Sequence, residues 1–558
     1  MMEQLARYYR TLRPLRAGQL LWQLYRRLRP VTQPAEVPLE RSRRLRAAAG
    51  FCAGPQPADA VLSFLNQTAS ADPDELSWHP SDRSRLWRYH LHYFDYLQWR
   101  CIPADWKTRY IDDWIAANPV GTATAWEPYP VSLRIVNWLK YFSTYADDIP
   151  QHWQHSLLNQ LHWLTHNLEH HLLANHLLKN AKALLLGGLW FKGANGQRFQ
   201  RLGEHYFIRE LREQLLPDGG HVERSPMYHS IVLEDCLDVL NFALPMRAQL
   251  HPNSLHELQR SAQHMLGFLA DVTLSDGDIA RFNDAASGVA PAPADLHDYG
   301  HAVCGHPVPA ANDGLHPIRR SASGYYGYRH RDDSLLIDCG PVGPDYQPGH
   351  AHCDMLSFEL CIDGLRVIVD PGVHGYDGDP TRNYLRSTAA HNTVVLNDAE
   401  QSELWGTFRV GRRARPLTAE LTDAGDGRLL FSGSHDGYRY LDAQATHQRC
   451  FDIDVAGRWE VRDVLSGGGD ATAVTYLHLA PSVEAVTGAG RTVTLRHNGT
   501  TVAELEFAAG MTAEIESGYV APYFGCREPA QIVALRCSGP LPLELSYRLQ
   551  RPAVARGH

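Results

Sequence analysis

The amino-acid sequence predicts a multidomain α+β protein in which a helical half precedes an antiparallel β-sandwich half. Apolar residues recur at helical spacing from about residue 85 to 315. After about residue 320 the chain changes to short runs rich in β-branched and aromatic residues, each bounded by turn residues. Because 558 residues are too many for one ordinary core, at least two substantial domains are expected.

The composition is that of a globular protein. Apolar residues make up 44% of the chain and charged residues 21%, and no stretch approaches the roughly 20 apolar residues that span a bilayer. The net charge of -9 argues against general attraction to nucleic acid. Ten scattered cysteines indicate neither a disulfide scaffold nor a cysteine-based zinc module, and they fit a reducing compartment.

The first 46 residues differ from the rest, since they carry eleven Arg, no Lys and three Glu among aromatic and aliphatic residues. We expect residues 1–60 to form a basic, helical segment. This segment is interpreted either as a helix that docks on its own protein or as a peripheral contact with an anionic membrane. Arg interrupts every candidate signal-sequence core, so a cytoplasmic location is expected, with the periplasm as the alternative.

The helical half contains one long leucine stripe. Its members step by three or four residues, which predicts one continuous helical face, and they are Leu157, Leu161, Leu164, Leu168 and Leu172. Short breaks containing Pro or Gly separate this segment from similar ones.

The second half contains two marked hairpin signals. Asp363-Gly364 and Asn498-Gly499 each lie between two strand-like runs, and both pairs favour type I′ turns. Several further strand candidates follow one another without intervening helices. An antiparallel sandwich of several sheets is therefore expected.

The stretch "GHAHCDMLSFEL", residues 349–360, carries ligand-type side chains beside a strand that looks buried. In an extended chain His350 and His352 share one face. Imidazole suits zinc, and such a pair needs one or two further ligands, for which Asp370 and His391 are candidates. Burying so many polar groups is costly unless they pair or bind something, so the sequence predicts a site here.

These motifs resemble those of the heparinase II/III-like polysaccharide lyases, in the alginate lyase/heparinase superfamily. The resemblance covers roughly residues 85 to 410, through "LWRYHLHYFDYL", "WEPYPVSLRIVNW", "LLANHLLKNAKAL", "DGGHVERSPMYH", "HAHCDMLSFEL", "DPGV" and "RNYLRSTAAHNTV". It implies an (α/α) toroid over residues 61–318 and a sandwich over residues 319–558 that carries the metal site. It also implies β-elimination of a uronic-acid-containing polysaccharide bound in a cleft between the two domains.

The resemblance further implies individual roles. The family's metal, usually zinc, is held by residues matching His352, Asp370 and His391, while His350 matches the catalytic histidine. We expect this zinc to be structural, as a clip that fixes the strands around His350.

Elimination beside a carboxylate needs a donor that neutralises the carboxylate, together with a base and an acid. Asn175 matches the family's neutralising position, and the adjacent His176 could assist it. Tyr228 matches the catalytic tyrosine, and His350 is the second proton-transfer candidate. Which of the two is the base is left open.

Further residues are candidates for contacts with the substrate. Tyr384 approximates a second active-site tyrosine of the family. Arg386 can grip a carboxylate with two donors, as can Arg134 and Arg224. Trp126 offers a flat face for a sugar ring, although aromatic residues in helical bundles are more often part of the core.

Rival functions remain. A glycoside hydrolase on the same toroid needs two opposed carboxylates, for which Glu127, Glu223 and Asp278 are candidates. A polysaccharide-binding factor without turnover is a further alternative. A metal-dependent hydrolase on a barrel is disfavoured, because the His-x-His pair follows some 300 mainly helical residues.

Overall fold

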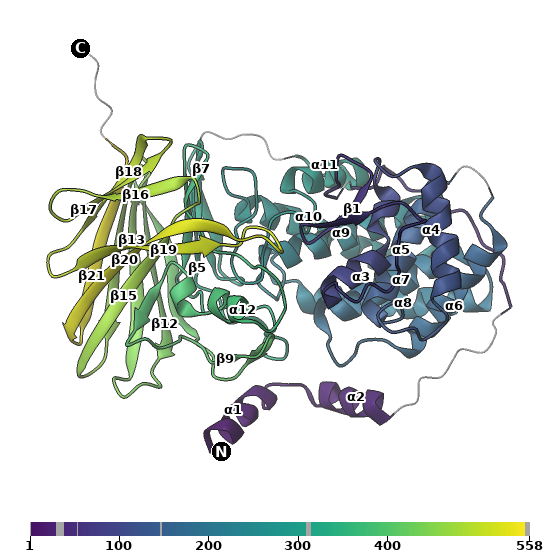
Figure 1. The fold of residues 1–558 in the computed structure, drawn as a ribbon, viewed down its shortest axis with the longest axis horizontal. Coiled ribbons are helices and arrows are strands. Elements are labelled where there is room, and N and C mark those ends of the chain that lie inside the picture. Colours follow the sequence, from purple (N-terminus) through teal and green to yellow (C-terminus); the bar gives the residue numbers. More distant parts are fainter. Residues whose placement is uncertain (1, 29–37, 53, 146–147, 309–313, 553–558) are drawn as a thin grey trace, which may run out of the picture.

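The structure is a computed structural model that describes residues 2–28, 38–52, 54–145, 148–308 and 314–552. Figure 1 shows a helical lobe on one side of the molecule and a lobe of strands on the other. The predicted order, a toroid of helices followed by an antiparallel β-sandwich, is confirmed. No helix in the part of the chain that the structure describes is long and apolar enough to cross a membrane.

The helical domain is built from nine α-helices in the described residues between 85 and 304. In chain order they are α3 (Arg85–Tyr93), α4 (Ala104–Ala117), α5 (Pro128–Thr144), α6 (Gln151–His166), α7 (Ala174–Trp190), α8 (Ala194–Gln214), α9 (Pro226–Ala243), α10 (Pro252–Val272) and α11 (Pro293–Cys304), with short 3-10 turns η1 (Asp95–Gln98) and η2 (Leu244–Gln249).

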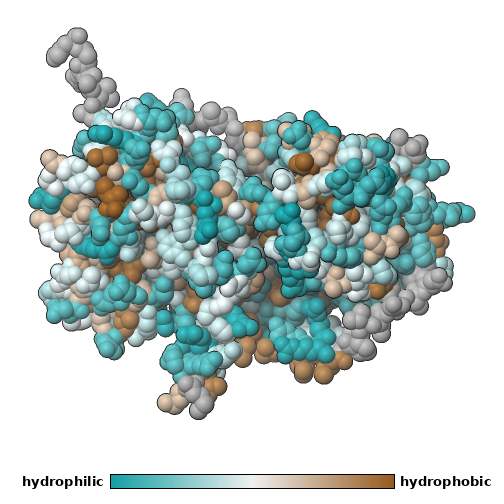
Figure 2. Space-filling view, viewed as in Figure 1, coloured by the Kyte–Doolittle hydropathy of each residue, from teal (hydrophilic) through white to brown (hydrophobic). Residues whose placement is uncertain are grey.

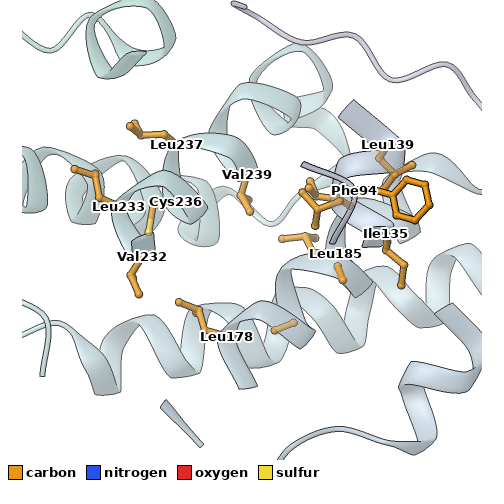
Figure 3. Packing of buried hydrophobic residues seen from close by; sticks show 14 of the residues in the cluster. Phe94, Ile135, Leu139, Leu178, Leu185, Val232, Leu233, Cys236, Leu237 and Val239 are labelled. Carbon is orange, nitrogen blue, oxygen red and sulfur yellow. The ribbon is translucent and has the colours of Figure 1, made fainter. Parts of the chain in front are cut away.

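Helix α7 lies at the centre of this domain, and His176 is its one residue that is not buried. It packs against α5, α8 and α9. The approach to α8 requires glycine, because a Cβ on Gly188 would lie 2.2 Å from the backbone nitrogen of Gln200. Figure 3 shows the apolar contacts between these helices, with Leu178 of α7 near the α9 side chains and Ile135 of α5 near Leu185.

The leucine stripe does not form one helix. Helix α6 ends at His166 and α7 begins at Ala174, so Leu168 and Leu172 lie in the connection between them. The chain turns at Leu173 and Ala174, whose φ angles of 64° and 48° are left-handed. Neither residue is a glycine, so the sequence carries no local signal for this break.

Three antiparallel sheets of more than two strands lie in the described residues of the second half. The five-stranded sheet is β3 (His316–Arg320), β4 (Tyr325–His330), β5 (Asp333–Asp338), β6 (Phe358–Ile362) and β7 (Leu365–Ile368). The four-stranded sheet, in spatial order, is β19 (Thr512–Val520), β20 (Glu528–Pro540), β15 (Asp470–His478) and β8 (Val394–Leu396). The eight-stranded sheet, in spatial order, is β11 (Pro416–Gly425), β12 (Arg428–Tyr438), β13 (Ala445–Asp454), β14 (Arg458–Ser466), β21 (Leu543–Gln550), β18 (Thr500–Phe507), β17 (Thr492–His497) and β16 (Val483–Thr487).

The five-stranded sheet joins the two domains. Every residue of β5 and β6 is buried, as expected for a sheet that is covered on both faces. Leu336 and Cys361 belong to the core of the helical domain, whereas Leu335 and Ile337 belong to the core of the sandwich. Small elements that follow this sheet are α12 (Pro380–Leu385), η3 (Thr388–Ala390) and the two-stranded hairpin of β9 (Leu404–Trp405) and β10 (Arg409–Val410).

Both predicted hairpin turns are present. Asp363 and Gly364, between β6 and β7, have φ angles of 51° and 75°. Asn498 and Gly499, between β17 and β18, have φ angles of 50° and 78°. Positive φ at both central residues is what a type I′ turn requires.

The basic N-terminal segment is helical only in part. Its helices are α1 (Met2–Leu12) and α2 (Ala17–Leu28), which lie along the lower edge of the molecule in Figure 1. Residues 38–52 and 54–60 contain no helix, so the prediction of helix over 1–60 is wrong there, and residues 29–37 lie outside the described part. A small hairpin of β1 (Val61–Phe64) and β2 (Gln67–Ser70) leads into the toroid.

Candidate active site and metal centre

Three residues predicted from separate parts of the sequence converge where the two domains meet. The rings of Tyr228 and His350 stack with their centroids 4.0 Å apart. Asn175 donates from Nδ2 to both carboxylate oxygens of Glu223, at 3.1 and 3.2 Å. Glu223 Oε2 in turn lies 3.8 Å from His350 Nε2. An amide, a carboxylate, an imidazole and a phenol therefore share one buried cluster.

Local sequence explains the placement of Tyr228. Ser225 caps helix α9 by accepting a hydrogen bond from the backbone nitrogen of Tyr228, and Pro226 occupies the first turn. The Ser225 hydroxyl also donates to the backbone oxygen of Asp284 at 2.7 Å. The tyrosine is thus held in the first turn of α9 and tied to the loop beneath His350. Burial raises the pKa of Tyr228 well above its usual range, so the phenol stays protonated at neutral pH.

His350 and His352 do not lie on a strand, because residues 349–357 form an irregular loop before β6. Their rings still converge, for a reason the sequence did not reveal. His350 Nδ1 donates to Asp284 Oδ2 and His352 Nε2 donates to Asp284 Oδ1, each at 2.9 Å. With its proton fixed on Nδ1, a neutral His350 has a free lone pair on Nε2, on the side of Glu223.

Asp284 is fully buried and is also bound by both terminal nitrogens of Arg382. Burial acts to raise the pKa of Asp284, but the Arg382 guanidinium and the two imidazoles hold it well below its usual range. The carboxylate is therefore ionised at neutral pH and orients both histidines. Asp284 lies in "RFNDAAS", which matches no motif. Arg382 is the first residue of "RNYLRST", the stretch in which the sequence predicts a role for Arg386.

The second tyrosine of the cluster is Tyr376, not Tyr384. The hydroxyl groups of Tyr228 and Tyr376 lie 2.9 Å apart. Tyr384 instead packs against Tyr519, with ring centroids 5.4 Å apart, and burial raises its pKa to about 12. Helix α12 turns Arg382, rather than its neighbour two positions on, toward Asp284, and the role predicted for Tyr384 stays a prediction.

His176 adjoins the cluster without joining its hydrogen bonds. Its Nδ1 lies 3.2 Å from Glu169 Oε1, and its ring packs 4.6 Å from that of Tyr129. Burial acts to lower the pKa of His176, but Glu169 outweighs burial and raises it. His176 is the partly exposed residue of α7, so it can present a positive charge beside Asn175.

The candidate metal centre lies on the other side of Asp284. One ligand atom each from His352, Asp354 and His391 fall within 4.8 Å of one another, and all three side chains are buried. His352 Nδ1 and His391 Nε2 are buried atoms that have no hydrogen-bond partner among the described residues. Each ring uses its other nitrogen to donate to a carboxylate, Asp284 or Asp370. This is the arrangement of metal-binding histidines, so the residues present fit a metal ion.

This group of three shares His352 and His391 with the predicted ligand set. Asp370 does not belong to the group of three; its Oδ2 accepts from His391 Nδ1 at 2.7 Å and orients that ring. Asp354, two residues after His352, takes its place. Burial raises the pKa of Asp354 to about 6, which a cation at this position would reverse.

Two residues predicted to bind substrate lie in the helical core instead. Arg134 is fully buried; it donates to Gln160 Oε1 at 2.9 Å and stacks on Trp114. Trp126 donates from Nε1 to the backbone oxygen of Asn118 and packs edge-on against Trp163. The structure does not bring either side chain into the site.

Arg224 and Arg386 have supporting positions near the site. Arg224 donates to backbone oxygens of Val222, Ala322 and Ser323, and so links the toroid to the sandwich. Arg386 likewise donates only to backbone oxygens, including that of Ala351, between the two histidines. All these acceptors are protein carbonyls, and among the described residues only the buried Nη2 of Arg386 has no acceptor.

The carboxylates considered for a hydrolase do not form an opposed pair. Glu127 is bound by Arg85 and by the hydroxyl of Tyr89. Asp278 accepts from the hydroxyl of Ser287. Only Glu223 lies in the cluster, and the carboxylate nearest to it across His350 is Asp284, which Arg382 and the two histidines occupy.

The fold and this site define a class of two-domain proteins with a helical toroid, a β-sandwich and a polar cluster between them. The chain belongs to the heparinase II/III-like family. The heparinase II/III N-terminal model matches residues 75–295 and the heparinase II/III-like C-terminal model matches residues 314–553.

Individual relatives are distant. The chain is 26% identical over 324 residues to a heparin-sulfate lyase of Pedobacter heparinus, covering 53% of this chain and 48% of the relative. It is 25% identical over 411 residues to the FtsZ-localized protein C of Caulobacter vibrioides, covering 69% and 65%. It thus spans about half to two thirds of the length of these curated relatives. The crystal structure of heparan sulfate lyase HepC from Pedobacter heparinus has a similar fold, with a TM-score of 0.57 and 19% identity over 87% of this chain and 79% of that one.

Proposed function

We propose that this protein is a polysaccharide lyase that cleaves a uronic-acid-containing polysaccharide, an exopolysaccharide or a glycosaminoglycan-like polymer, by β-elimination. The observation that supports this most is the convergence of Asn175, Tyr228 and His350 in one cluster between the toroid and the sandwich. The family membership supports the same class of reaction.

The reaction removes the proton on the carbon next to the sugar carboxylate and expels the neighbouring glycosidic oxygen. A carbanion beside a negative carboxylate is disfavoured, so the carboxylate must be neutralised. We assign this task to the amide of Asn175, assisted by the positive charge of His176.

The proton transfers follow from the state of each group. His350 has its Nδ1 proton fixed by Asp284, so Nε2 accepts the proton from carbon. Tyr228 is protonated and donates its proton to the leaving oxygen, while the electrons of the broken C–H bond form the new C=C bond. Tyr376, hydrogen-bonded to Tyr228, can return a proton to the phenolate after release.

We propose that His352, Asp354 and His391 hold a zinc ion with a structural role. Such an ion would neutralise Asp354 and link the loop of His352 to η3 and the start of β8. The ion would fix His352, and His350, two residues earlier in the same loop, would thereby keep its position.

An ultraviolet assay tests the reaction class. Elimination leaves an unsaturated uronate at the new non-reducing end, which absorbs in the ultraviolet, and hydrolysis does not. We expect purified protein, screened against a panel of uronate polymers, to produce this absorbance with at least one of them. New reducing ends without absorbance would identify a glycoside hydrolase, and binding without cleavage a polysaccharide-binding factor.

The cytoplasmic location stays a prediction, which cell fractionation would test.

A further inference from the structure

The two N-terminal helices turn their apolar faces away from the protein. The structure describes 19 large hydrophobic side chains as exposed, and 11 of them lie within residues 2–28. Helix α1 buries no residue, and α2 buries only Gln19. An amphipathic helix that docks on its own protein normally buries its apolar stripe, and here the stripe is left outside.

Polar side chains of both helices contact the body of the protein, together with the rings of Tyr8 and Trp22, which pack on Trp405 and His170. In α1, Arg7 and Arg10 donate to Glu403, and the hydroxyl of Thr11 accepts from Trp405. These bonds anchor α1 to the sandwich domain beside the β9–β10 hairpin. They leave Met2, Leu5, Tyr9 and Leu12, spaced three or four residues apart, on the outer face, described hereafter as the α1 stripe.

Helix α2 is held in the same way on the toroid side. Gln19 donates to the backbone oxygen of Tyr346, and Arg26 donates to His171. The outer positions Leu21, Leu24 and Leu28 form the α2 stripe and are 66%, 56% and 74% exposed. Figure 2 shows apolar atoms along the lower edge of the molecule, where Figure 1 places these helices.

We propose that α1 and α2 form a docking surface for a lipid bilayer that contains anionic lipid. Three features favour a bilayer over other occupants. The two stripes lie on successive helices along one edge of the molecule. The amphipathic side chains of Tyr9, within the α1 stripe, and Tyr25, beside the α2 stripe, are exposed, and such rings favour the headgroup region.

Charge complementarity is the third feature. The side chains of Arg13 and Arg27 are exposed and make no hydrogen bond or ion pair with any residue that the structure describes. They lie at the C-terminal ends of α1 and α2, so each stripe has a free guanidinium at its edge. Arginine at the border of an apolar stripe attracts anionic headgroups.

Docking would place the candidate active site near the bilayer. Glu403 and Trp405, which hold α1, lead into the hairpin whose Phe408 ring lies 6.0 Å from that of His350. His171, which holds α2, precedes Asn175 by four residues. The docking surface stands on its own observations and does not depend on the proposed lyase reaction.

Co-sedimentation of the full chain with vesicles tests this proposal. We expect binding at about 0.15 M salt to phosphatidylcholine vesicles with about 30% phosphatidylglycerol, and weaker binding to phosphatidylcholine alone. The double variant Leu21→Glu/Leu24→Glu should bind at least about tenfold less tightly, because two side chains that would enter the apolar region become charged. Thermal unfolding should be unchanged, since both positions are exposed.

The matched control is Leu430→Glu/Val486→Glu, which adds the same charge at exposed apolar positions of the sandwich. It should bind within about twofold of the unmodified chain, as its side chains lie outside the surface. Equal losses in the two double variants would overturn the proposal, and so would absence of binding to the anionic vesicles. A dimer in analytical ultracentrifugation that only Leu21→Glu/Leu24→Glu disrupts, without vesicle binding, would assign the surface to a second copy instead.

Discussion

Two buried clusters in this protein have nearly the same residue composition but differ in how many of their polar atoms have hydrogen-bond partners. In the candidate active site, Asp284 accepts from Arg382, His350 and His352. In the sandwich core, Asp463 accepts from Arg449 at 2.7 and 2.8 Å, from His447 at 2.8 Å and from Thr475. Each is a buried aspartate held by one arginine and by histidine, two histidines at Asp284 and one at Asp463.

The two clusters differ in the histidine nitrogens that do not bond to the aspartate. In the sandwich, the second nitrogen of His447 bonds to His435, whose own second nitrogen accepts from the backbone of Gly437. At the active site, His352 Nδ1 has no partner and His350 Nε2 has only Glu223 at 3.8 Å. A saturated cluster stabilises the fold, whereas a cluster with free nitrogens can bind a metal or move a proton.

The largest effects on turnover are expected from substitutions of the two proton-transfer groups. Tyr228→Phe and His350→Gln should each lower turnover by about 100- to 10,000-fold, because each removes one proton-transfer group. The free energy of unfolding should change little, since both replacements are close in shape. Steady-state ultraviolet assays and urea denaturation of each variant measure the two quantities.

Tyr384→Phe is the matched control for Tyr228→Phe, since this tyrosine packs outside the cluster against Tyr519. Its turnover should equal that of the unmodified protein. If Tyr384→Phe abolished cleavage while Tyr228→Phe retained it, the assignment of the second tyrosine to Tyr376 would be wrong.

Sequence patterns were sufficient for the architecture, because helical periodicity and hairpin pairs are local. The turns at Asp363-Gly364 and Asn498-Gly499 adopt the expected conformation because two residues determine it. The break before α7 was missed, since Leu173 and Ala174 adopt left-handed conformations that tertiary contacts, and not their own preferences, impose.

Site residues were predictable where a motif carries them and not otherwise. Asn175, Tyr228 and His350 lie in such motifs, and the structure brings them together. Asp284 comes from a loop far from all three in sequence, and only folding shows that it orients His350. A motif can also mislead. Arg134 lies in the motif "WEPYPVSLRIVNW" and was predicted to bind substrate, but its side chain is buried against Gln160 and Trp114.

The saturated cluster should control stability and not turnover. Asp463→Asn should cost about 3–5 kcal/mol in the free energy of unfolding, because it leaves Arg449 buried without its counter-charge. Turnover per folded molecule, measured well below the unfolding temperature, should be unchanged. A loss of turnover at full stability would show that this cluster also serves the site.

The same cluster predicts the direction of a pH effect. Burial acts to raise the pKa of Asp463, but Arg449 and His447 hold it far below its ordinary value. Its contribution to stability is therefore complete above about pH 5 and is lost progressively as the pH falls from the unfolded-state pKa of about 4 toward the much lower folded-state pKa. In Asp463→Asn, urea denaturation between about pH 5 and 3 should show a shallower decline than in the unmodified chain, because the titrating group is absent.

The smallest effects are expected at the candidate metal centre, where single substitutions distinguish a metal ligand from a residue that only orients a ligand. Zinc in about 100-fold excess over its dissociation constant should stabilise the protein by about 2.7 kcal/mol. Removing it with a chelator should lower the unfolding temperature, and adding zinc should restore it. Asp354→Asn removes a ligand-type carboxylate, whereas Asp370→Asn removes only the group that orients His391.

Asp354→Asn should therefore weaken zinc binding more than Asp370→Asn, for which a loss of about 10- to 100-fold is typical of an orienting carboxylate. Competition titrations with a chromophoric chelator measure both affinities. A larger loss of zinc affinity in Asp370→Asn than in Asp354→Asn would place Asp370 on the metal, as the family resemblance implied. It would also mean that the His391 ring changes its orientation when the ion binds. Absence of zinc binding by the unmodified protein would leave the free nitrogens of His352 and His391 to some other ligand, and the contrast with the saturated cluster around Asp463 would then rest on His350 alone.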